Sequence, residues 1–436
     1  MAGLAAQSHK PMPVAELKLL VLREAISRGL LDDATPLVGF IDEDGIRKTV
    51  AELQQSFGDN FFHSFAVKAN SIHDVLSILC ESGMGAEVAS FGELAQALKA
   101  GFKPADIVLD EPAKTELLIR EVLERSVNLN IDNFQEFEAV KRTVKREGAR
   151  SRIGFRVNPQ VGAGHIAAMS TAQATSKFGV PLVDAGLRDQ IIDLYCRHSW
   201  LTSVHTHVGS QGCPMELMAE GISRVVELAE EVNQKVGTPQ ITTINIGGGL
   251  TVNFDGDEIA PRFSDYADVL RERVPALFSG RYRVVTEFGR SVLAKNGFIA
   301  SKVEYTKMSG GRRIAITHAG AQVAARTVFM PEAWPIRISA HNSDGSPKST
   351  PVIGQNIAGP CCFDGDMLAV NRELPLLEKD DFVMLHETGA YYLSNPFYYN
   401  SLPAPPVYGF SYQSEEVGFV SMRPAQTIEQ MMAVLG

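Results

Sequence analysis

The hydrophobic pattern of the chain changes character along its length. Residues 14–31 carry apolar positions at helical spacing, which predicts an N-terminal helix, and a short apolar run at 37–41 predicts a strand. From residue 61 onward, short apolar runs alternate with amphipathic stretches. After Arg290 the helical rhythm stops, and the apolar runs are joined by turns rich in Gly and Pro. The sequence therefore predicts an α/β region followed by a mostly β region.

The α/β region contains eight candidate strands, and amphipathic segments typical of helices lie between most of them, at 73–82, 92–100, 115–125, 134–147 and 216–236. Strands that alternate with helices in this way predict a (β/α)₈ barrel, with a doubly wound open sheet as the alternative. The strands are expected at residues 61–67, 85–89, 107–109, 128–131, 152–158, 201–208, 242–246 and 281–288.

The C-terminal third predicts a second domain that is mostly antiparallel β. A polar stretch at 339–351 predicts an exposed loop there. We assign residues 36–296 to the barrel, and residues 1–35 together with 297–436 to the β domain, to which the N-terminal helix contributes. Strands of this domain are expected at 301–306, 313–318, 352–358 and 382–385.

Composition narrows the classes of function. The formal net charge of -10 argues against nucleic acid and anionic membranes as partners. No apolar run approaches the ~20 residues of a membrane span, and residues 1–13 lack the pattern of a signal peptide. The five cysteines are scattered, odd in number and without metal-binding spacing. We therefore expect no metal and a reduced, cytoplasmic location.

Lys68 is the first candidate for chemistry. It follows the apolar run at 61–67 and precedes the polar residues Asn70 and Ser71. A nearby low-dielectric core lowers the pKa of a lysine and favours the free amine that a Schiff base requires. The alternative is a lysine that simply ends a strand and points into water.

Further polar groups and glycines follow the later strands. His207 and Ser210 come after the sixth strand, three glycines at 247–249 after the seventh, and Glu287 and Arg290 after the eighth. Functional groups of a barrel gather at the carboxyl ends of its strands, and consecutive glycines there allow backbone N–H groups to bind a phosphate. Taken singly, the glycines could form a tight turn and His207 could be a core residue. A lysine, a carboxylate, a flat imidazole and a phosphate cradle together indicate pyridoxal phosphate.

The motifs also resemble those of the fold-type III pyridoxal-phosphate decarboxylases, the family of diaminopimelate, ornithine and arginine decarboxylases. The resemblance extends from about residue 36 to residue 406. The motifs that carry it, in order, are FAVKAN at 65–70, EVAS at 87–90, SKFG at 176–179, HVGSQ at 207–211, NIGGG at 245–249, EFGR at 287–290, GPCCFDGD at 359–366 and GAY at 389–391.

The resemblance implies a role for each matching residue. Lys68 resembles the lysine that links to the cofactor, Glu287 the partner of the pyridine nitrogen, and His207 the imidazole that stacks on the ring. Cys362 resembles the cysteine that returns a proton after CO₂ leaves, and in this family it comes from the second subunit of a homodimer with shared active sites. Contacts to the cofactor phosphate and the substrate carboxylate are implied for Ser210, Gly248, Gly249, Gly289, Arg290 and Tyr391.

The chain departs from the family at positions that concern the substrate. Phe363 follows the cysteine where members acting on basic side chains carry an acid, and we treat Asp364 as a possible substitute. Met330 and Trp334 stand where diaminopimelate decarboxylases carry Arg and Tyr. We expect these changes to remove charged recognition of a distal carboxylate and a distal amine. The expected substrate residues are Arg290, Met330, Trp334, Phe363, Asp364 and Tyr391.

The sequence thus predicts a decarboxylase of an amino acid or amino-acid conjugate other than meso-diaminopimelate or ornithine, with an apolar, aromatic or larger side chain. Four alternatives remain open. They are a diaminopimelate decarboxylase with an altered pocket, a siderophore-type decarboxylase of citryl-amino acids suggested by the Pro-x-x-Trp segment, an amino-acid racemase, and a non-catalytic regulatory homologue. Glu287 argues against the racemase, and the presence of both Lys68 and Cys362 argues against the regulator.

Overall fold

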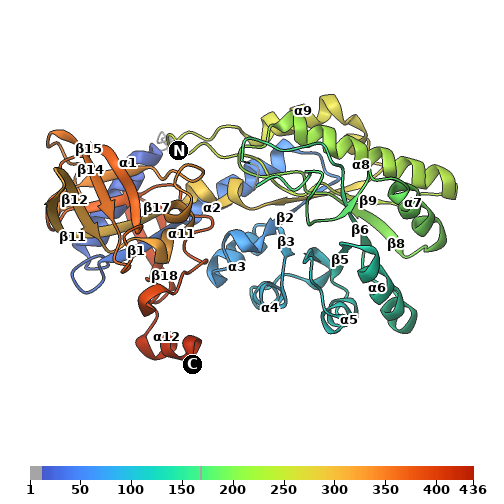
Figure 1. Ribbon diagram of the computed structural model, residues 1–436, viewed down its shortest axis with the longest axis horizontal. Coiled ribbons are helices and arrows are strands. Elements are labelled where there is room, and N and C mark those ends of the chain that lie inside the picture. Colours follow the sequence, from blue (N-terminus) through green and yellow to red (C-terminus); the bar gives the residue numbers. More distant parts are fainter. Residues whose placement is uncertain (1–11, 167–168) are drawn as a thin grey trace, which may run out of the picture.

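The computed structural model describes residues 12–166 and 169–436, so the prediction about a leader at residues 1–13 falls almost wholly outside the described chain. A closed barrel of parallel strands lies beside a second, mixed sheet that is mostly antiparallel (Figure 1). The C-terminal helix α12 (Ile428–Leu435) projects from the β domain. None of the helices in the described ranges has the length and apolar character needed to cross a bilayer.

The parallel sheet closes on itself, because β10 pairs with β2 as well as with β9. This closure confirms the (β/α)₈ barrel and excludes the open sheet. Strands such as β6 are buried along their whole length, as expected where helices cover a parallel sheet. The barrel strands are β2 (Phe61–Ala66), β3 (Gly85–Val88), β4 (Ile107–Leu109), β5 (Asn128–Ile131), β6 (Ile153–Asn158), β8 (Leu201–His205), β9 (Thr243–Asn245) and β10 (Arg283–Phe288).

Helices cover the outside of the barrel, and several begin at polar caps that the sequence supplies. The side chains of Ser90, Thr115 and Asn133 each accept a hydrogen bond from a backbone N–H in the first turn of the next helix. The surrounding helices are α2 (Glu43–Ser56), α3 (His73–Glu81), α4 (Phe91–Lys99), α5 (Glu116–Glu124), α6 (Phe134–Glu147), α7 (Leu187–Arg197), α8 (Met215–Val236) and α9 (Phe263–Arg273).

The strand β1 (Leu37–Asp42) corrects the predicted domain boundary at residue 36. It pairs antiparallel with β11 (Gly297–Ser309) and parallel with β17 (Val407–Gln413), so it belongs to the second sheet. Residues 37–41 are all buried. A strand buried on both faces fits the centre of either sheet equally well, and its hydrophobic pattern does not reveal which sheet it joins.

The second sheet runs in the order β15, β14, β12, β11, β1, β17, β18, and β16 pairs with both β11 and β13. The exposed loop predicted at 339–351 is wrong at its first residues. Residues 339–341 lie in β13 and pair with β16. The remaining strands are β12 (Arg312–Thr317), β13 (Ile338–His341), β14 (Val352–Ala358), β15 (Met367–Pro375), β16 (Phe382–Leu385) and β18 (Glu416–Arg423).

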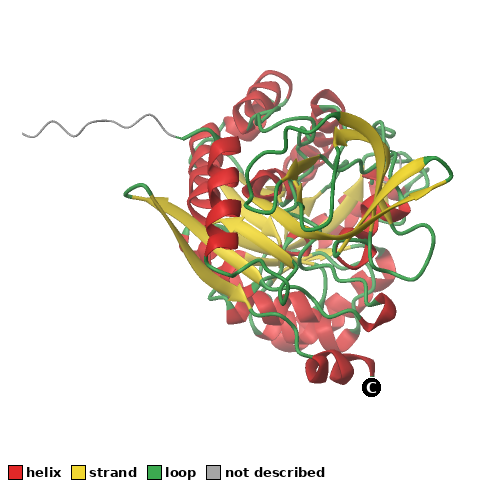
Figure 2. Ribbon diagram, turned by 90° about the vertical axis from the view of Figure 1, so that its left-hand side faces the viewer, coloured by secondary structure: helices red, strands yellow, loops and turns green. Residues whose placement is uncertain are grey.

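The N-terminal helix α1 (Val14–Ser27) packs on strands of the second sheet. Val21 and Leu22 are fully buried in a small core that includes Phe40 and Phe298. In Figure 2, which shows the molecule from the β-domain side, helix and strands are seen in front of the barrel. The helix therefore contributes to the β domain although it precedes the barrel in the sequence.

Buried ion pairs join the barrel to the β domain. Asp257, from the loop after β9, accepts hydrogen bonds from Lys18 of α1 at 2.9 Å and from Arg337 at 2.7 Å. Arg337 also pairs with Glu387, which follows β16, at 2.6 Å. Asp257, His386 and Glu387 lie close enough together to ligate a metal. The two carboxylates, however, are already neutralised by these cations.

Candidate active site

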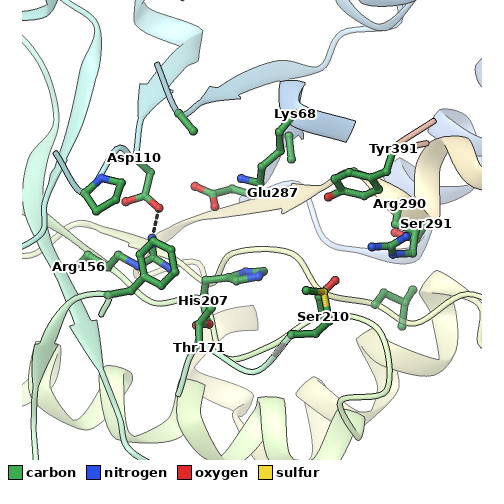
Figure 3. Close-up of a pocket in the computed structure, with 18 of the residues that line it drawn as sticks. Lys68, Asp110, Arg156, Thr171, His207, Ser210, Glu287, Arg290, Ser291 and Tyr391 are labelled. Atoms are coloured by element: carbon green, nitrogen blue, oxygen red, sulfur yellow. Dashed lines mark hydrogen bonds and ion pairs between the residues drawn. The ribbon is translucent and has the colours of Figure 1, made fainter. Parts of the chain in front are cut away.

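A cavity of about 360 Å³ lies at the carboxyl ends of the barrel strands, where the β domain contributes part of its wall (Figure 3). This is the end of a barrel at which active sites are built. Met330, Trp334, Gly248, Cys362, Phe363 and Asp364 do not line it. The predicted residues that do line it are Lys68, His207, Ser210, Gly249, Glu287, Gly289, Arg290 and Tyr391.

Lys68 lies in a short 3₁₀ turn directly after β2, and its Nζ is 2.6 Å from Oε2 of Glu87 on β3. Burial lowers the pKa of Lys68, but the nearby Glu87 carboxylate outweighs this effect, and the net pKa is raised. The predicted lowering of this pKa is therefore wrong, because the sequence pattern does not show the carboxylate on the neighbouring strand. Burial also raises the pKa of Glu87.

Loops of the two domains hold the Lys68 turn in place. The N–H of Tyr391 donates to the carbonyl of Ala69 at 2.7 Å, and the amide of Asn70 donates to the carbonyl of Gly389 at 2.9 Å. Tyr391 has a φ of 67°, which is uncommon for a residue with a side chain. The β domain thus fixes the position of Lys68 and brings Tyr391 to the cavity.

Glu287 ends β10 and is oriented by a neighbouring amide. Nδ2 of Asn245 donates to its Oε1 at 2.6 Å, and Nδ1 of His205 lies 4.0 Å from the same oxygen. His205 is fully buried, and burial lowers its pKa. The carboxylates of Glu287 and Asp110 outweigh that effect and raise the pKa of His205 overall.

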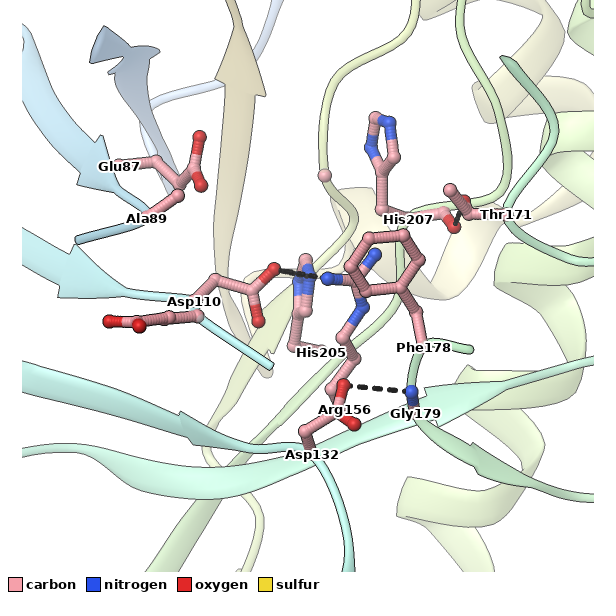
Figure 4. A network of polar contacts seen from close by, with 12 residues as sticks. Glu87, Ala89, Asp110, Asp132, Arg156, Thr171, Phe178, Gly179, His205 and His207 are labelled. Carbon is pink, nitrogen blue, oxygen red and sulfur yellow. Dashed lines mark hydrogen bonds and ion pairs between the residues drawn. The ribbon is translucent and has the colours of Figure 1, made fainter. Parts of the chain in front are cut away.

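A buried ion pair between Arg156 and Asp110 lines the cavity (Figure 4). Nη1 of Arg156 is 2.6 Å from Oδ2 of Asp110, and Nε2 of His205 is 3.4 Å from the same oxygen. Burial raises the pKa of Asp110, but Arg156 and His205 together hold it well below its usual value. Arg156 also stacks on the ring of Phe178, 4.2 Å from its centroid, which explains the position of the SKFG motif.

His207 is a neutral imidazole in this environment, because burial lowers its pKa well below the usual value and Arg156 and Lys68 lower it further. Its Nδ1 accepts a hydrogen bond from the N–H of Gly248 at 3.1 Å. This bond assigns the ring proton to Nε2. It also means that the N–H of Gly248 is already used within the protein.

Gly249 lines the cavity where no larger residue fits. Its φ is +108°, and a Cβ at this position would lie 2.0 Å from the carbonyl oxygen of Gly209. The glycine therefore keeps the backbone close to the cavity wall beside the Ser210 hydroxyl. Backbone and hydroxyl groups of this kind are neutral donors suited to a phosphate.

Arg326, which the sequence reasoning missed, brings a second guanidinium to the cavity wall beside Arg290. Arg326 lies on α11 (Ala321–Phe329), and both guanidiniums pack on the rings of Trp334 and Tyr391. A guanidinium therefore remains on the cavity wall although Met330 stands at the position of the missing arginine. Arg326 precedes Met330, the position of the missing arginine, by four residues, and this helical spacing was the signal that could have revealed it.

The Cys362 loop lies apart from the cavity of its own chain. Cys362 is exposed, and its N–H donates to Oδ1 of Asn400 at 2.7 Å. The next residue, Phe363, stacks on Phe329 with parallel rings 5.7 Å apart and meets Tyr399 edge-on. Asp364 is exposed and lines no cavity. The loop thus presents a thiol within an aromatic surface.

The groups around the cavity fit pyridoxal phosphate. They comprise a lysine amine, a buried carboxylate, a neutral imidazole, and neutral donors at Gly249 and Ser210. Oε1 of Glu87 and Nε of Arg290 are buried without a hydrogen-bond partner in the described chain. A bound ligand could therefore supply the hydrogen bonds that these two atoms lack. Fold and site together define a barrel enzyme of the pyridoxal-phosphate class.

Comparison with known proteins gives the family. The profile of the pyridoxal-binding domain of pyridoxal-dependent decarboxylases matches residues 43–294. Diaminopimelate decarboxylase of Pseudomonas fluorescens is 34% identical over 335 residues, which cover 75% of this chain and 76% of that protein. The chain therefore belongs to the pyridoxal-dependent decarboxylases, and it is a carboxy-lyase that uses pyridoxal phosphate.

Solved structures agree on the fold. Diaminopimelate decarboxylase from Helicobacter pylori, complexed with L-lysine, superimposes with a TM-score of 0.81 at 25% identity, covering 94% of this chain and 99% of that one. A lysine/ornithine decarboxylase from Vibrio vulnificus, at 20% identity and a TM-score of 0.73, covers 90% of this chain and 98% of that one and shares the architecture. The chain is thus a decarboxylase of the diaminopimelate/ornithine type.

Proposed function

We propose that this enzyme decarboxylates an amino acid or amino-acid conjugate other than meso-diaminopimelate or ornithine. The observation that carries the proposal is the residue after Cys362. Phe363 offers an aromatic ring, packed against Phe329, where a carboxylate would be needed to pair with a distal ammonium group. An unpaired charge in a closed site is costly, so a substrate with a distal amine is disfavoured.

The roles of the barrel residues follow from their positions. Lys68 holds the cofactor covalently, and Glu287, oriented by Asn245, keeps a negative charge beside the ring nitrogen. His207 presents a neutral ring face, and Ser210 and Gly249 bind the phosphate. Pyridoxal phosphate, when bound, supplies the electron sink that accepts the electron pair left when CO₂ departs.

The proton that replaces CO₂ comes from Cys362 in this proposal. Because this thiol is exposed and outside the cavity of its own chain, the site is completed by Cys362 of a second copy in a homodimer. The aromatic surface around it supports this arrangement, since Phe329 and Met330 are 56% and 46% exposed in the single chain. A second subunit would cover this apolar surface.

The proposal is tested by measuring CO₂ release from a panel of amino acids with the purified, cofactor-loaded enzyme. We expect release from substrates without a distal amine and slow turnover of ornithine and meso-diaminopimelate. Rapid turnover of meso-diaminopimelate would instead indicate a diaminopimelate decarboxylase with an altered pocket. Racemised amino acid without CO₂ would contradict the proposed reaction on that substrate.

A further inference from the structure

Two guanidinium groups lie side by side at one end of the cavity. Cζ of Arg290 is 4.4 Å from the ring centroids of both Trp334 and Tyr391, and Cζ of Arg326 is 4.2 Å from that of Tyr391 and 5.3 Å from that of Trp334. Neither arginine forms an ion pair with a carboxylate in the part of the chain that the structure describes. Figure 3 places Arg290 beside Tyr391, opposite the end that holds Asp110 and Arg156.

The two arginines carry positive charge without a negatively charged partner in the described chain. Arg290 is only 5% exposed, and its Nε and Nη1 of Arg326 are buried without a hydrogen-bond partner among the described residues. The pKa of Arg290 is lowered to about 10, mainly by burial and in part by the charge of Arg326. The faces of Trp334 and Tyr391 offset part of this cost through cation–π contacts, but they supply no full negative charge.

Three other cations line the cavity, and one of them, Lys177, packs on the ring of Phe178 at 4.8 Å from its centroid, the ring that also contacts Arg156. Lys68 pairs with Glu87 at 2.6 Å, and Arg156 pairs with Asp110 at 2.6 Å. Among the arginines that line the cavity, Arg290 and Arg326 are therefore the two without a carboxylate partner in the described chain. Planar guanidiniums bind carboxylates through two parallel hydrogen bonds, and this match favours a carboxylate as the ligand.

We propose that Arg290 and Arg326 together bind a carboxylate on the side chain of the substrate, which makes the substrate class acidic amino acids or amino-acid conjugates. This inference rests on the proposed function and names the group that the cavity selects. Arg326 is the specificity-determining residue, and it approaches from α11, one turn before Met330.

Two other anions fit this position less well. The α-carboxylate must lose its charge when it leaves as CO₂, so two strong ion pairs to it would stabilise the ground state and slow the reaction. The cofactor phosphate has its own neutral donors at Gly249 and Ser210. A carboxylate that stays on the substrate benefits from the arginines throughout the reaction.

The test uses the cofactor-loaded enzyme, so that the phosphate site is already filled, and compares wild type with Arg326→Gln. Glutarate serves as the probe because it has two carboxylates and no amine to react with the cofactor. Calorimetric titration should show that glutarate binds wild type and that Arg326→Gln weakens the binding about tenfold or more. Arg197→Gln, an exposed change on α7 that removes the same charge, is the matched control and should bind as wild type does.

Two further measurements separate this inference from its alternatives. Cofactor affinity, followed by absorbance titration of the cofactor-free protein, should change less than about twofold in Arg326→Gln. An equal loss of cofactor affinity would assign the arginine to the phosphate and overturn the inference, as would equal glutarate binding in both proteins or none in wild type. If no amino acid releases CO₂, the proposed function is wrong. The glutarate titration would still show whether Arg290 and Arg326 bind a carboxylate.

Discussion

At the scale of single residues, Glu287 carries the negative charge on which the proposed chemistry depends. Nδ2 of Asn245 donates to this carboxylate at 2.6 Å and keeps it oriented, and the buried ring of His205 lies beside it. Glu287→Gln keeps the size of the side chain but removes the charge beside the ring nitrogen. We expect kcat to fall about 10- to 100-fold, in line with the ~1.5–3 kcal/mol of a hydrogen bond to a charged group.

Steady-state kinetics of Glu287→Gln provide the measurement, and the absorbance of the bound cofactor shows whether the variant is still loaded. His205→Gln is a useful companion, because the buried ring of His205 lies 4.0 Å from Oε1 of Glu287 and its replacement should lower kcat in the same direction but less. An unchanged kcat in a fully loaded Glu287→Gln enzyme would contradict the role of this residue.

Cys362 gives a second prediction at this scale. Cys362→Ala should keep the absorbance of the bound cofactor but lower turnover about 10²- to 10⁴-fold, because the proposed proton donor is absent. Cys361→Ala is the matched control, since that thiol is buried in its own chain and hydrogen-bonds to Gln322 rather than facing outward. Full activity of Cys362→Ala would mean that the proton comes from another group.

Sequence reasoning placed the residues better than it described their electrostatics. The strand end that carries Lys68 and the glycines after β9 were predicted from pattern and spacing. The raised pKa of Lys68 was not, because Glu87 reaches it across neighbouring strands whose pairing no local pattern reveals. Arg326 was missed for a related reason, since its contacts to Tyr391 join residues far apart in the sequence.

At the scale of elements, the loop at 359–366 presents Cys362 and Phe363 together. Buried Asp366 holds this loop, because its carboxylate accepts hydrogen bonds from the backbone N–H groups of Ala321 and Cys361 at 2.6 and 2.7 Å. The loop is therefore fixed to α11, the helix that carries Arg326. Residues that serve the two different active sites of the proposed dimer are thus anchored to one another.

Phe363→Glu tests the role of this loop in substrate choice. A carboxylate at this position can pair with a distal ammonium group, so kcat/KM for ornithine should rise about tenfold or more, which corresponds to ~1.4 kcal/mol. Phe363→Leu replaces the ring with a smaller apolar side chain and adds no charge, so it should show no such gain. Equal kcat/KM for ornithine in both variants would place the specificity elsewhere.

Several elements could not have been located from pattern alone. The barrel strands were predicted closely because runs buried by helices on one side and by the barrel interior on the other are continuously apolar. β15, β17 and β18 were not predicted, since their buried and exposed positions alternate irregularly. Strand β1 was recognised as a strand but assigned to the wrong sheet.

At the scale of the whole molecule, the Asp257 ion pairs link the two domains that form the cavity. Burial raises the pKa of Asp257, but Arg337 and Lys18 outweigh it and hold this pKa well below its usual value. A carboxyl whose pKa is lowered on folding stabilises the fold above its unfolded pKa of about 3.9, and the contribution is lost as pH falls below it.

Asp257→Asn should therefore lower the free energy of unfolding at pH 7 by about 1.5–3 kcal/mol. The difference from wild type should be constant above about pH 5 and should shrink as the pH falls below 4. Urea unfolding at several pH values measures it, and Asp255→Asn, an exposed change two residues away, is the control. A difference that stays the same down to pH 3 would contradict the ion-pair explanation.

The most direct test of the whole account is the product that the cofactor-loaded enzyme forms from a mixed library of acidic, neutral and basic amino acids and conjugates. Mass spectrometry of the products identifies which substrate has lost one CO₂. The account predicts an amine that retains a side-chain carboxylate, with little product from ornithine or lysine. A product mixture dominated by the decarboxylation of ornithine or meso-diaminopimelate would contradict it.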